Sequence, residues 1–98
     1  MPYEDQFAAL AHPLRQQIIG LLQSDPASVS DLTEALDASQ PVVSQHLKVL
    51  RTAGLVSAEA HGMKRIYALD PEALDALRAF LTEEWHAAFA KIGDTDNA

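Results

Sequence analysis

The sequence predicts a mainly helical α+β fold with about five helices and one two-stranded β-hairpin, in the order ααααββα. Three observations predict it. Apolar residues recur every three or four positions in five separate segments, as on one face of a helix. Between residues 55 and 69 the pattern becomes strand-like. Prolines and N-capping residues stand where the helices are expected to begin. With 98 residues the chain has the length of one domain, expected to span 1–98.

Two helices are expected near the N-terminus. Residues 4–11 are good helix formers. Pro13 suits the first turn of a second helix, because its missing N–H costs nothing there. This second helix has an amphipathic stripe with helical spacing, and the segment 23–26 ends it. The stripe consists of Leu14, Ile18, Leu21 and Leu22.

Two further helices follow, separated by a short turn. Ser28 is the expected N-cap of the first, with Asp31 three residues later as in a capping box, and this helix should stop near residues 37–38. Ser39 is the expected N-cap of the second helix, which runs from about 40 to 53 and ends at Gly54, a C-cap glycine. The apolar residues that share one face of the second helix are Val43, Leu47 and Leu50.

The remainder of the chain predicts a hairpin and a long helix. Residues 55–60 and 65–69 are typical of strands, and the segment 61–63 between them contains a glycine suited to a turn. Asp70 is then the expected N-cap of a helix over about 71–90. The polar tail 93–98 is expected to be frayed.

Composition excludes several classes of protein. Without cysteine the chain has no disulfide scaffold, thiolate nucleophile or cysteine-based metal site. No apolar run approaches the roughly 20 residues of a membrane span, and the acidic N-terminus is unlike a secretory signal, so a cytoplasmic protein is expected. The sequence contains no nucleophile elbow, glycine-rich phosphate loop or metal triad, which argues against an enzyme.

Charge is distributed unevenly along the chain. The net charge of −7 argues against nucleic-acid binding for the molecule as a whole. Residues 38–69, however, contain four basic residues and one acidic residue, a net charge of +3, whereas the rest of the chain has three basic and 13 acidic residues, a net charge of −10. One basic third therefore decides how the function is interpreted.

Within this basic third, two helices joined by a short turn and followed by a basic hairpin describe a winged helix-turn-helix. The face of the second helix opposite its apolar stripe is polar, and side chains such as Ser44 and Gln45 can hydrogen-bond base edges. Lys48 and Arg51 suit phosphates. The expected DNA-binding residues are Ser39, Gln40, Pro41, Ser44, Gln45, His46, Lys48, Arg51, Lys64 and Arg65.

His46 occupies a different position from the other residues of this set. It lies on the flank of the helix, beside Val42 and Val49, rather than at the centre of the polar face. A partly buried imidazole bonded to a backbone group or a phosphate is favoured over a base contact.

The last helix has a wider apolar stripe than one small domain needs for its own core. A second copy of the chain would bury this stripe and stabilise a small monomer. The expected dimer-interface residues of this helix are Leu74, Leu77, Leu81, Trp85 and Ala88.

Three segments resemble the ArsR/SmtB family of bacterial repressors, in that family's order. Residues 39–56 (SQPVVSQHLKVLRTAGLV) are similar to its recognition helix, 10–15 (LAHPLR) to its early helix and 62–69 (GMKRIYAL) to its wing, and the resemblance covers roughly 5–90. It implies a homodimer that binds double-stranded DNA at an imperfect inverted repeat and blocks transcription. It also implies that the first and last helices form the dimer interface, which adds Phe7 of the first helix to the expected interface residues. The residues it places at DNA-contacting positions are Gln40, Pro41, Ser44, Gln45 and Lys48.

The resemblance also raises the question of metal sensing. Many relatives bind metal on the last helix through aspartate, histidine, histidine and glutamate. Asp75 and His86 match two of these positions, whereas Ala73 and Phe89 occupy the other two. Two ligands do not hold zinc tightly, so we expect no metal and no cofactor, and the effector is left open. The alternative to a DNA-binding repressor is a winged-helix module that binds another protein.

Overall fold

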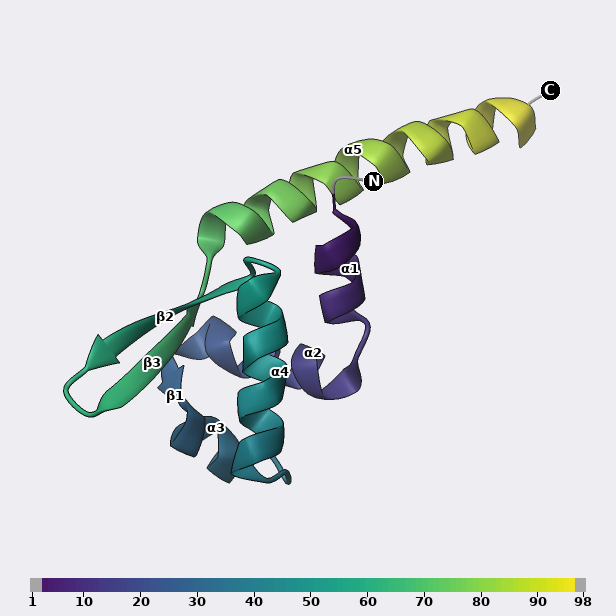
Figure 1. The fold of residues 1–98 in the computed structure, drawn as a ribbon. Helices are drawn as coiled ribbons and strands as arrows, with labels where there is room; N and C mark the ends of the chain where they lie inside the picture. Colours follow the sequence, from purple (N-terminus) through teal and green to yellow (C-terminus); the bar gives the residue numbers. More distant parts are fainter. Residues whose placement is uncertain (1–2, 97–98) are drawn as a thin grey trace.

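The computed structural model describes residues 3–96, and within this range it does not describe the side chains of residues 85, 88, 89 and 91–96. The described residues form five helices and a small antiparallel sheet. The first four helices and the sheet form one body, from which the last helix projects (Figure 1). The elements are α1 Glu4–Leu10, α2 Pro13–Ser24, β1 Ala27–Ser28, α3 Val29–Ala35, α4 Gln40–Thr52, β2 Val56–His61, β3 Lys64–Leu69 and α5 Pro71–Asp96. The predicted five helices and hairpin are confirmed.

Local capping explains where these helices begin. The hydroxyl of Ser28 accepts from the backbone N–H of Asp31, whose carboxylate accepts from the N–H of Ser28, so the predicted capping box is present. The backbone N–H of Ser28, and after it the Ser28 hydroxyl, stabilise the charged carboxylate of the exposed Asp31 and hold its pKa below the usual value. Ser39 Oγ accepts from Val42 N–H at 3.4 Å, and Asp70 Oδ1 from Ala73 N–H at 3.0 Å.

The sheet has one more strand than the sequence predicted. Its order is β1-β3-β2, with Ala27 opposite Tyr67 and Ser28 opposite Ile66. A strand of two residues is too short to show alternation, which is why the sequence did not reveal it. The hairpin also differs slightly: β2 and β3 pair as far as His61 and Lys64, so residues 62–63 alone form the turn, with Gly62 at a φ of +64°.

Helix α4 lies at the centre of the core. Its predicted apolar face is fully buried, with Val43, Leu47 and Leu50 at 0% exposure. Helices α1, α2 and α3 and strand β2 all contact α4. Because several elements share this one helix, its orientation is fixed by the core. The other large side chains that are fully buried are Ile18, Leu32 and Leu55.

Helix α5 only partly belongs to this body. It continues to Asp96, beyond the expected end near residue 90, so residues 93–96 of the expected frayed tail are helical. In Figure 1 it passes α1 and extends away from the other elements. Near its start Leu77, only 4% exposed, packs into the core, and the Phe80 ring packs against that of Tyr3 in a tilted arrangement, with ring centroids 4.7 Å apart. No helix in the described part of the chain is long and apolar enough to span a membrane.

Part of the expected dimer stripe is therefore used within the protomer. Leu77 belongs to the protomer's own core, Leu74 packs against that core, and Phe7 lies 6.0 Å from Phe80 between ring centroids. Leu81 is half-buried. The side chains of Trp85 and Ala88 lie outside the described residues.

Replacing each of two glycines by alanine should change the free energy of unfolding in opposite directions. Gly54 has a φ of +80°, so Gly54→Ala should lower the free energy of unfolding by about 1–2 kcal/mol, although its Cβ would meet no atom within 4 Å. Gly20 lies inside α2 with equally open space, so Gly20→Ala should raise it by about 0.5–1 kcal/mol. Urea unfolding of both variants measures these changes. Equal effects would contradict the assignment of Gly54 as the left-handed residue that ends α4.

Candidate nucleic-acid interface

The exposed side of α4 is polar and carries most of the residues that the sequence selected. Because the core fixes the rotation of α4, its opposite face points to solvent. A shallow hollow on this face is lined by Pro41, Ser44, Gln45 and Lys48, together with the exposed Val42. Gln40 is exposed at the first position of the helix, and the Ser39 hydroxyl serves as its N-cap. The structure therefore brings these side chains together on one surface.

A second, strongly positive hollow lies between α4 and the hairpin. Its volume is about 470 Å³, and among the described residues no carboxylate lines it. Three cations and three hydroxyl groups make a suitable environment for an anion such as a DNA phosphate. We call this hollow the basic notch; it is lined by Ser44, Lys48, Arg51, Thr52, Arg65 and Tyr67.

Two members of the basic notch are absent from the predicted set of DNA-binding residues. Thr52 lies one turn beyond Lys48 on the same face of α4. Tyr67 lies two residues after Arg65 on β3, and side chains two apart point to the same face of a strand. Once Lys48 and Arg65 are predicted to bind phosphate, their spacing from Thr52 and Tyr67 predicts that these two side chains lie on the same surface.

The two basic residues of the wing are separated rather than paired. Lys64 and Arg65 are adjacent in β3, so their side chains point to opposite faces of the hairpin. Arg65 lines the basic notch, and Lys64 does not. The charge of Lys64 instead acts on Asp31 at the start of α3, where it contributes to lowering the pKa of that carboxyl. Only Arg65 therefore faces α4.

His46 lies away from this surface, in contact with α2. Its Nδ1 accepts a hydrogen bond from Arg15 Nε at 3.1 Å, and its ring lies 4.4 Å from that of His12 between centroids. The sequence favoured a backbone group or a phosphate as the partner of this imidazole. The structure instead places the guanidinium of Arg15, 31 residues earlier in the chain, at Nδ1. His12 itself is the N-cap of α2, since its Nδ1 accepts from Leu14 N–H at 3.2 Å.

Arg15 connects three helices at this point. Besides His46 on α4, it donates through Nη1 to the carbonyl oxygens of Ala9 at 3.1 Å and Ala8 at 3.3 Å, at the end of α1. The half-buried imidazole of His46 must stay neutral to accept from Arg15. Burial, the His12 ring and the Arg15 charge all lower the pKa of His46 below its ordinary value of 6.5.

Metal ligands do not gather anywhere in the described part of the chain: no group of three or more histidine or acidic side chains is placed to hold an ion. Asp75, one of the two positions that match the family's metal site, accepts from Arg78 on the same helix at 2.8 Å. His86 is exposed, further along α5.

Known proteins with similar sequences and structures are transcriptional regulators. Residues 12–58 match the family described as "Bacterial regulatory protein, arsR family". The chain is 43% identical to HTH-type transcriptional regulator Rv2034 of Mycobacterium tuberculosis, over 90% of this chain and 85% of that protein. It is 38% identical to the arsenical resistance operon repressor of Bacillus subtilis, over 96% of this chain and 88% of that protein.

Solved structures agree with the sequence comparison. The structure of an ArsR-like transcriptional regulator from Rhodococcus sp. RHA1 superposes with a TM-score of 0.78 at 28% identity, covering 93% of this chain and 89% of that one. The winged-helix architecture predicted from the sequence is therefore confirmed.

The neutral state of His46 predicts a pH-dependent stability. Because the folded pKa lies below the unfolded value, the stabilisation is complete above about pH 6.5 and is lost as the pH falls through the folded pKa. The free energy of unfolding should therefore be lower at about pH 5.5 than at about pH 7.5. Denaturant titrations at the two pH values, with an NMR titration of the imidazole, measure this.

A glutamine variant controls this prediction. His46→Gln keeps an acceptor but does not titrate, so its stability should depend less on pH between these values. Equal pH dependence in the wild type and His46→Gln would refute the role of His46.

Proposed function

Because the chain belongs to the arsR family of bacterial regulatory proteins and is thus a DNA-binding transcriptional regulator, we propose that it is a homodimeric repressor of an inverted-repeat operator. The observation that carries this proposal is the basic notch, which lies directly beside the polar face of α4. The relative from Bacillus subtilis is named as a repressor, which supports repression as the direction of control.

Base recognition is assigned to the first two turns of α4. Recognition helices meet base edges with their N-terminal residues, and here these residues are small or polar and exposed. Ser44 and Gln45 supply donors and acceptors near the middle of the hollow, and Gln40 supplies them at the helix start. Pro41 adds an apolar surface suited to a thymine methyl group.

Phosphate binding is assigned to the basic notch. Its cations come from two elements, Lys48 and Arg51 from α4 and Arg65 from β3, so a phosphate held there would fix the wing relative to the recognition helix. Lys64, on the other face of the wing, is left to contribute only long-range attraction.

A dimer is supported by helix α5. This helix has 26 residues, but the described contacts of its side chains with the body lie near its start, at Leu74, Leu77 and Phe80. The part that extends beyond α1 in Figure 1 is available to a second copy, with Leu81 at the boundary. Two copies would place two α4 helices in successive major grooves, which an inverted repeat requires.

The proposed repressor does not sense metal through cysteine-based sites. The chain contains no cysteine, and the carboxylate of Asp75 is occupied by Arg78. We therefore expect operator binding to be unaffected by zinc.

The assignment of phosphate binding to the basic notch predicts that replacing Arg65 lowers DNA affinity more than replacing the adjacent Lys64. Arg65→Ala should weaken binding to all duplexes alike and reduce the slope of log K against log salt by about 0.9, since one phosphate contact is lost. Lys64→Ala, the matched control, should change the slope much less. Fluorescence anisotropy on duplexes from the gene's own upstream region, with random duplex as competitor, measures both.

The same titration tests the proposed function itself. Saturable, sequence-selective and salt-sensitive binding by the wild type is expected, with and without zinc. Binding that is insensitive to salt, or absent from every upstream duplex, would instead favour a protein partner for the winged helix.

Helix α5 supplies a prediction for the dimer. Leu81→Glu should weaken self-association by at least about tenfold, because a charge would be buried between the two copies. Thr82→Glu places the same charge on the exposed neighbouring position and should leave the dimer intact. Sedimentation velocity over a range of concentrations distinguishes the two variants. Identical association constants would exclude this part of α5 from the interface.

A further inference from the structure

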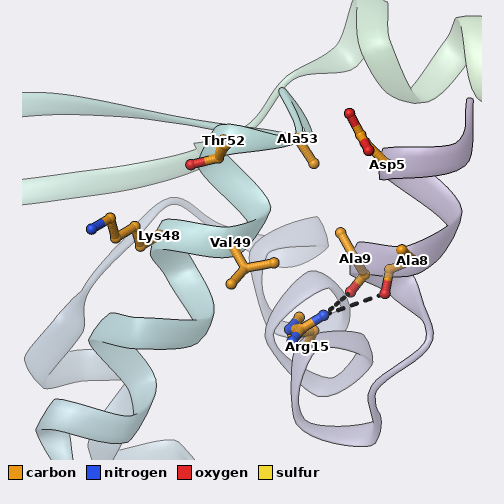
Figure 2. Close-up of a pocket in the computed structure, with 8 residues that line it drawn as sticks. All are labelled: Asp5, Ala8, Ala9, Arg15, Lys48, Val49, Thr52 and Ala53. Carbon is orange, nitrogen blue, oxygen red and sulfur yellow. Dashed lines mark hydrogen bonds between the residues drawn. The ribbon is translucent and has the colours of Figure 1, made fainter.

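An open groove between α1 and α4 adjoins the basic notch, with which it shares Lys48 and Thr52. Its volume is about 380 Å³, and Figure 2 shows the side chains that line it. Ala8 and Ala9 of α1 form one wall, and Val49 and Ala53 of α4 form the other. Val49 is 38% exposed, so this wall offers apolar surface to a ligand.

Arg15 of α2 lies at the base of this groove (Figure 2). Its Nε and Nη1 donate to three acceptors, all of them neutral: the imidazole of His46 and the carbonyl groups of Ala8 and Ala9. No carboxylate of the described residues lies within ion-pair distance of Arg15. A half-buried guanidinium that has only neutral partners is a strong site for an anionic group.

The other charged side chains of the groove narrow the class of ligand. Lys48 contributes its aliphatic chain, which extends away from α1 in Figure 2. Asp5 lies at the opposite edge, where its carboxylate disfavours a second anionic group on the ligand. A cavity of about 150 Å³ holds benzene. The present groove is therefore large enough for a bicyclic ring that carries one carboxylate.

We infer that this groove binds a small apolar monocarboxylic acid, with its carboxylate on Arg15 and its ring between Val49 and the α1 alanines. The effect of this ligand on DNA binding rests on the proposed repressor function, because it requires that the protein bind an operator. Among the described residues, Asp5 is the single carboxylate at the groove and no histidine lines it, so the groove does not suit a metal ion.

The position of Arg15 gives such a ligand a route to the recognition helix. Arg15 is the hydrogen-bonded connection between the end of α1 and His46 on α4. A carboxylate carries a full opposite charge, which the imidazole of His46 lacks, so a bound acid attracts the guanidinium more strongly than His46 does and draws it away. The ring meanwhile adds contacts with both α1 and α4. Both changes alter how α4 is held relative to α1, and the ligand therefore weakens operator binding.

The first experiment measures ligand binding on the free protein. The probe is 1-naphthoate, and the matched neutral compound is 1-naphthamide, which has the same shape without the charge. In ¹H–¹⁵N NMR titrations we expect saturable shifts at Ala8, Val49 and the Arg15 Nε–H with naphthoate, and at least tenfold weaker binding of the amide. Equal affinity for the two compounds, or shifts spread over the surface, would overturn the inference.

Two phenylalanine variants locate the site. Val49→Phe fills the groove and should reduce naphthoate affinity at least tenfold. Leu21→Phe is the control, because Leu21 is an aliphatic residue with nearly the same exposure, 37%, that does not line this groove. Circular dichroism verifies that both variants fold. Unchanged naphthoate binding by a folded Val49→Phe protein would exclude the groove as the site.

The second experiment measures the effect on DNA. Naphthoate, but not naphthamide, should raise the dissociation constant for the operator about tenfold in wild-type protein and much less in Val49→Phe. Tight operator binding that naphthoate leaves unchanged would overturn the regulatory part of the inference. Ligand binding without any operator binding would instead count against the proposed function, and the NMR result would still stand.

The alternative to a small carboxylic acid in this groove is a second copy of the chain that covers it. In that case naphthoate would fail to bind, and Val49→Phe would change the monomer–dimer equilibrium in sedimentation velocity while Leu21→Phe would not. This outcome would overturn the inference.

Discussion

The structure depends on one constraint, which is that α4 must bury one face completely and leave the other face open. Val43, Leu47 and Leu50 have no exposed surface, so the helix cannot rotate without losing core contacts worth a few kcal/mol for each large side chain. This constraint fixes the direction of Ser44, Gln45 and Lys48 without any contact made by those residues themselves. The recognition surface is thus positioned by the apolar face behind it.

The same helix also connects the proposed DNA-binding surface with the rest of the molecule. At the C-terminal end of α4 the Ala53 carbonyl accepts a hydrogen bond from Gln6 on α1 at 3.0 Å. About two turns earlier on α4, His46 accepts a hydrogen bond from Arg15. Both contacts lead to α1, which packs against α5 through Phe7, Tyr3 and Phe80. Helices α1 and α5 are therefore connected with α4 by hydrogen bonds and ring contacts.

Periodicity and capping signals were sufficient to predict every helix, because each helix is amphipathic or begins at a recognisable cap. They failed where the structure depends on contacts between distant residues. The Arg15–His46 hydrogen bond joins residues 31 apart, and β1 exists only because Tyr67 and Ile66 provide edge partners. Leu77 was assigned to a dimer stripe because spacing cannot tell which part of a long apolar face its own domain covers.

The uneven charge distribution gives the proposed repressor a particular kind of selectivity. The basic third of the chain supplies the cations at the notch, whereas a net charge of −10 lies outside residues 38–69. Acidic groups further than about 10 Å from a phosphate are largely screened at physiological salt, so they do not abolish contact at the notch, but they lower the attraction of the molecule as a whole for any polyanion. Binding at random sequence relies on that general attraction, whereas binding at the operator adds base contacts from α4. An acidic protein with a small basic surface consequently binds random DNA weakly, and base contacts from α4 supply a larger share of its affinity at the operator. It also depends more on a second copy, because each copy contributes only one basic notch.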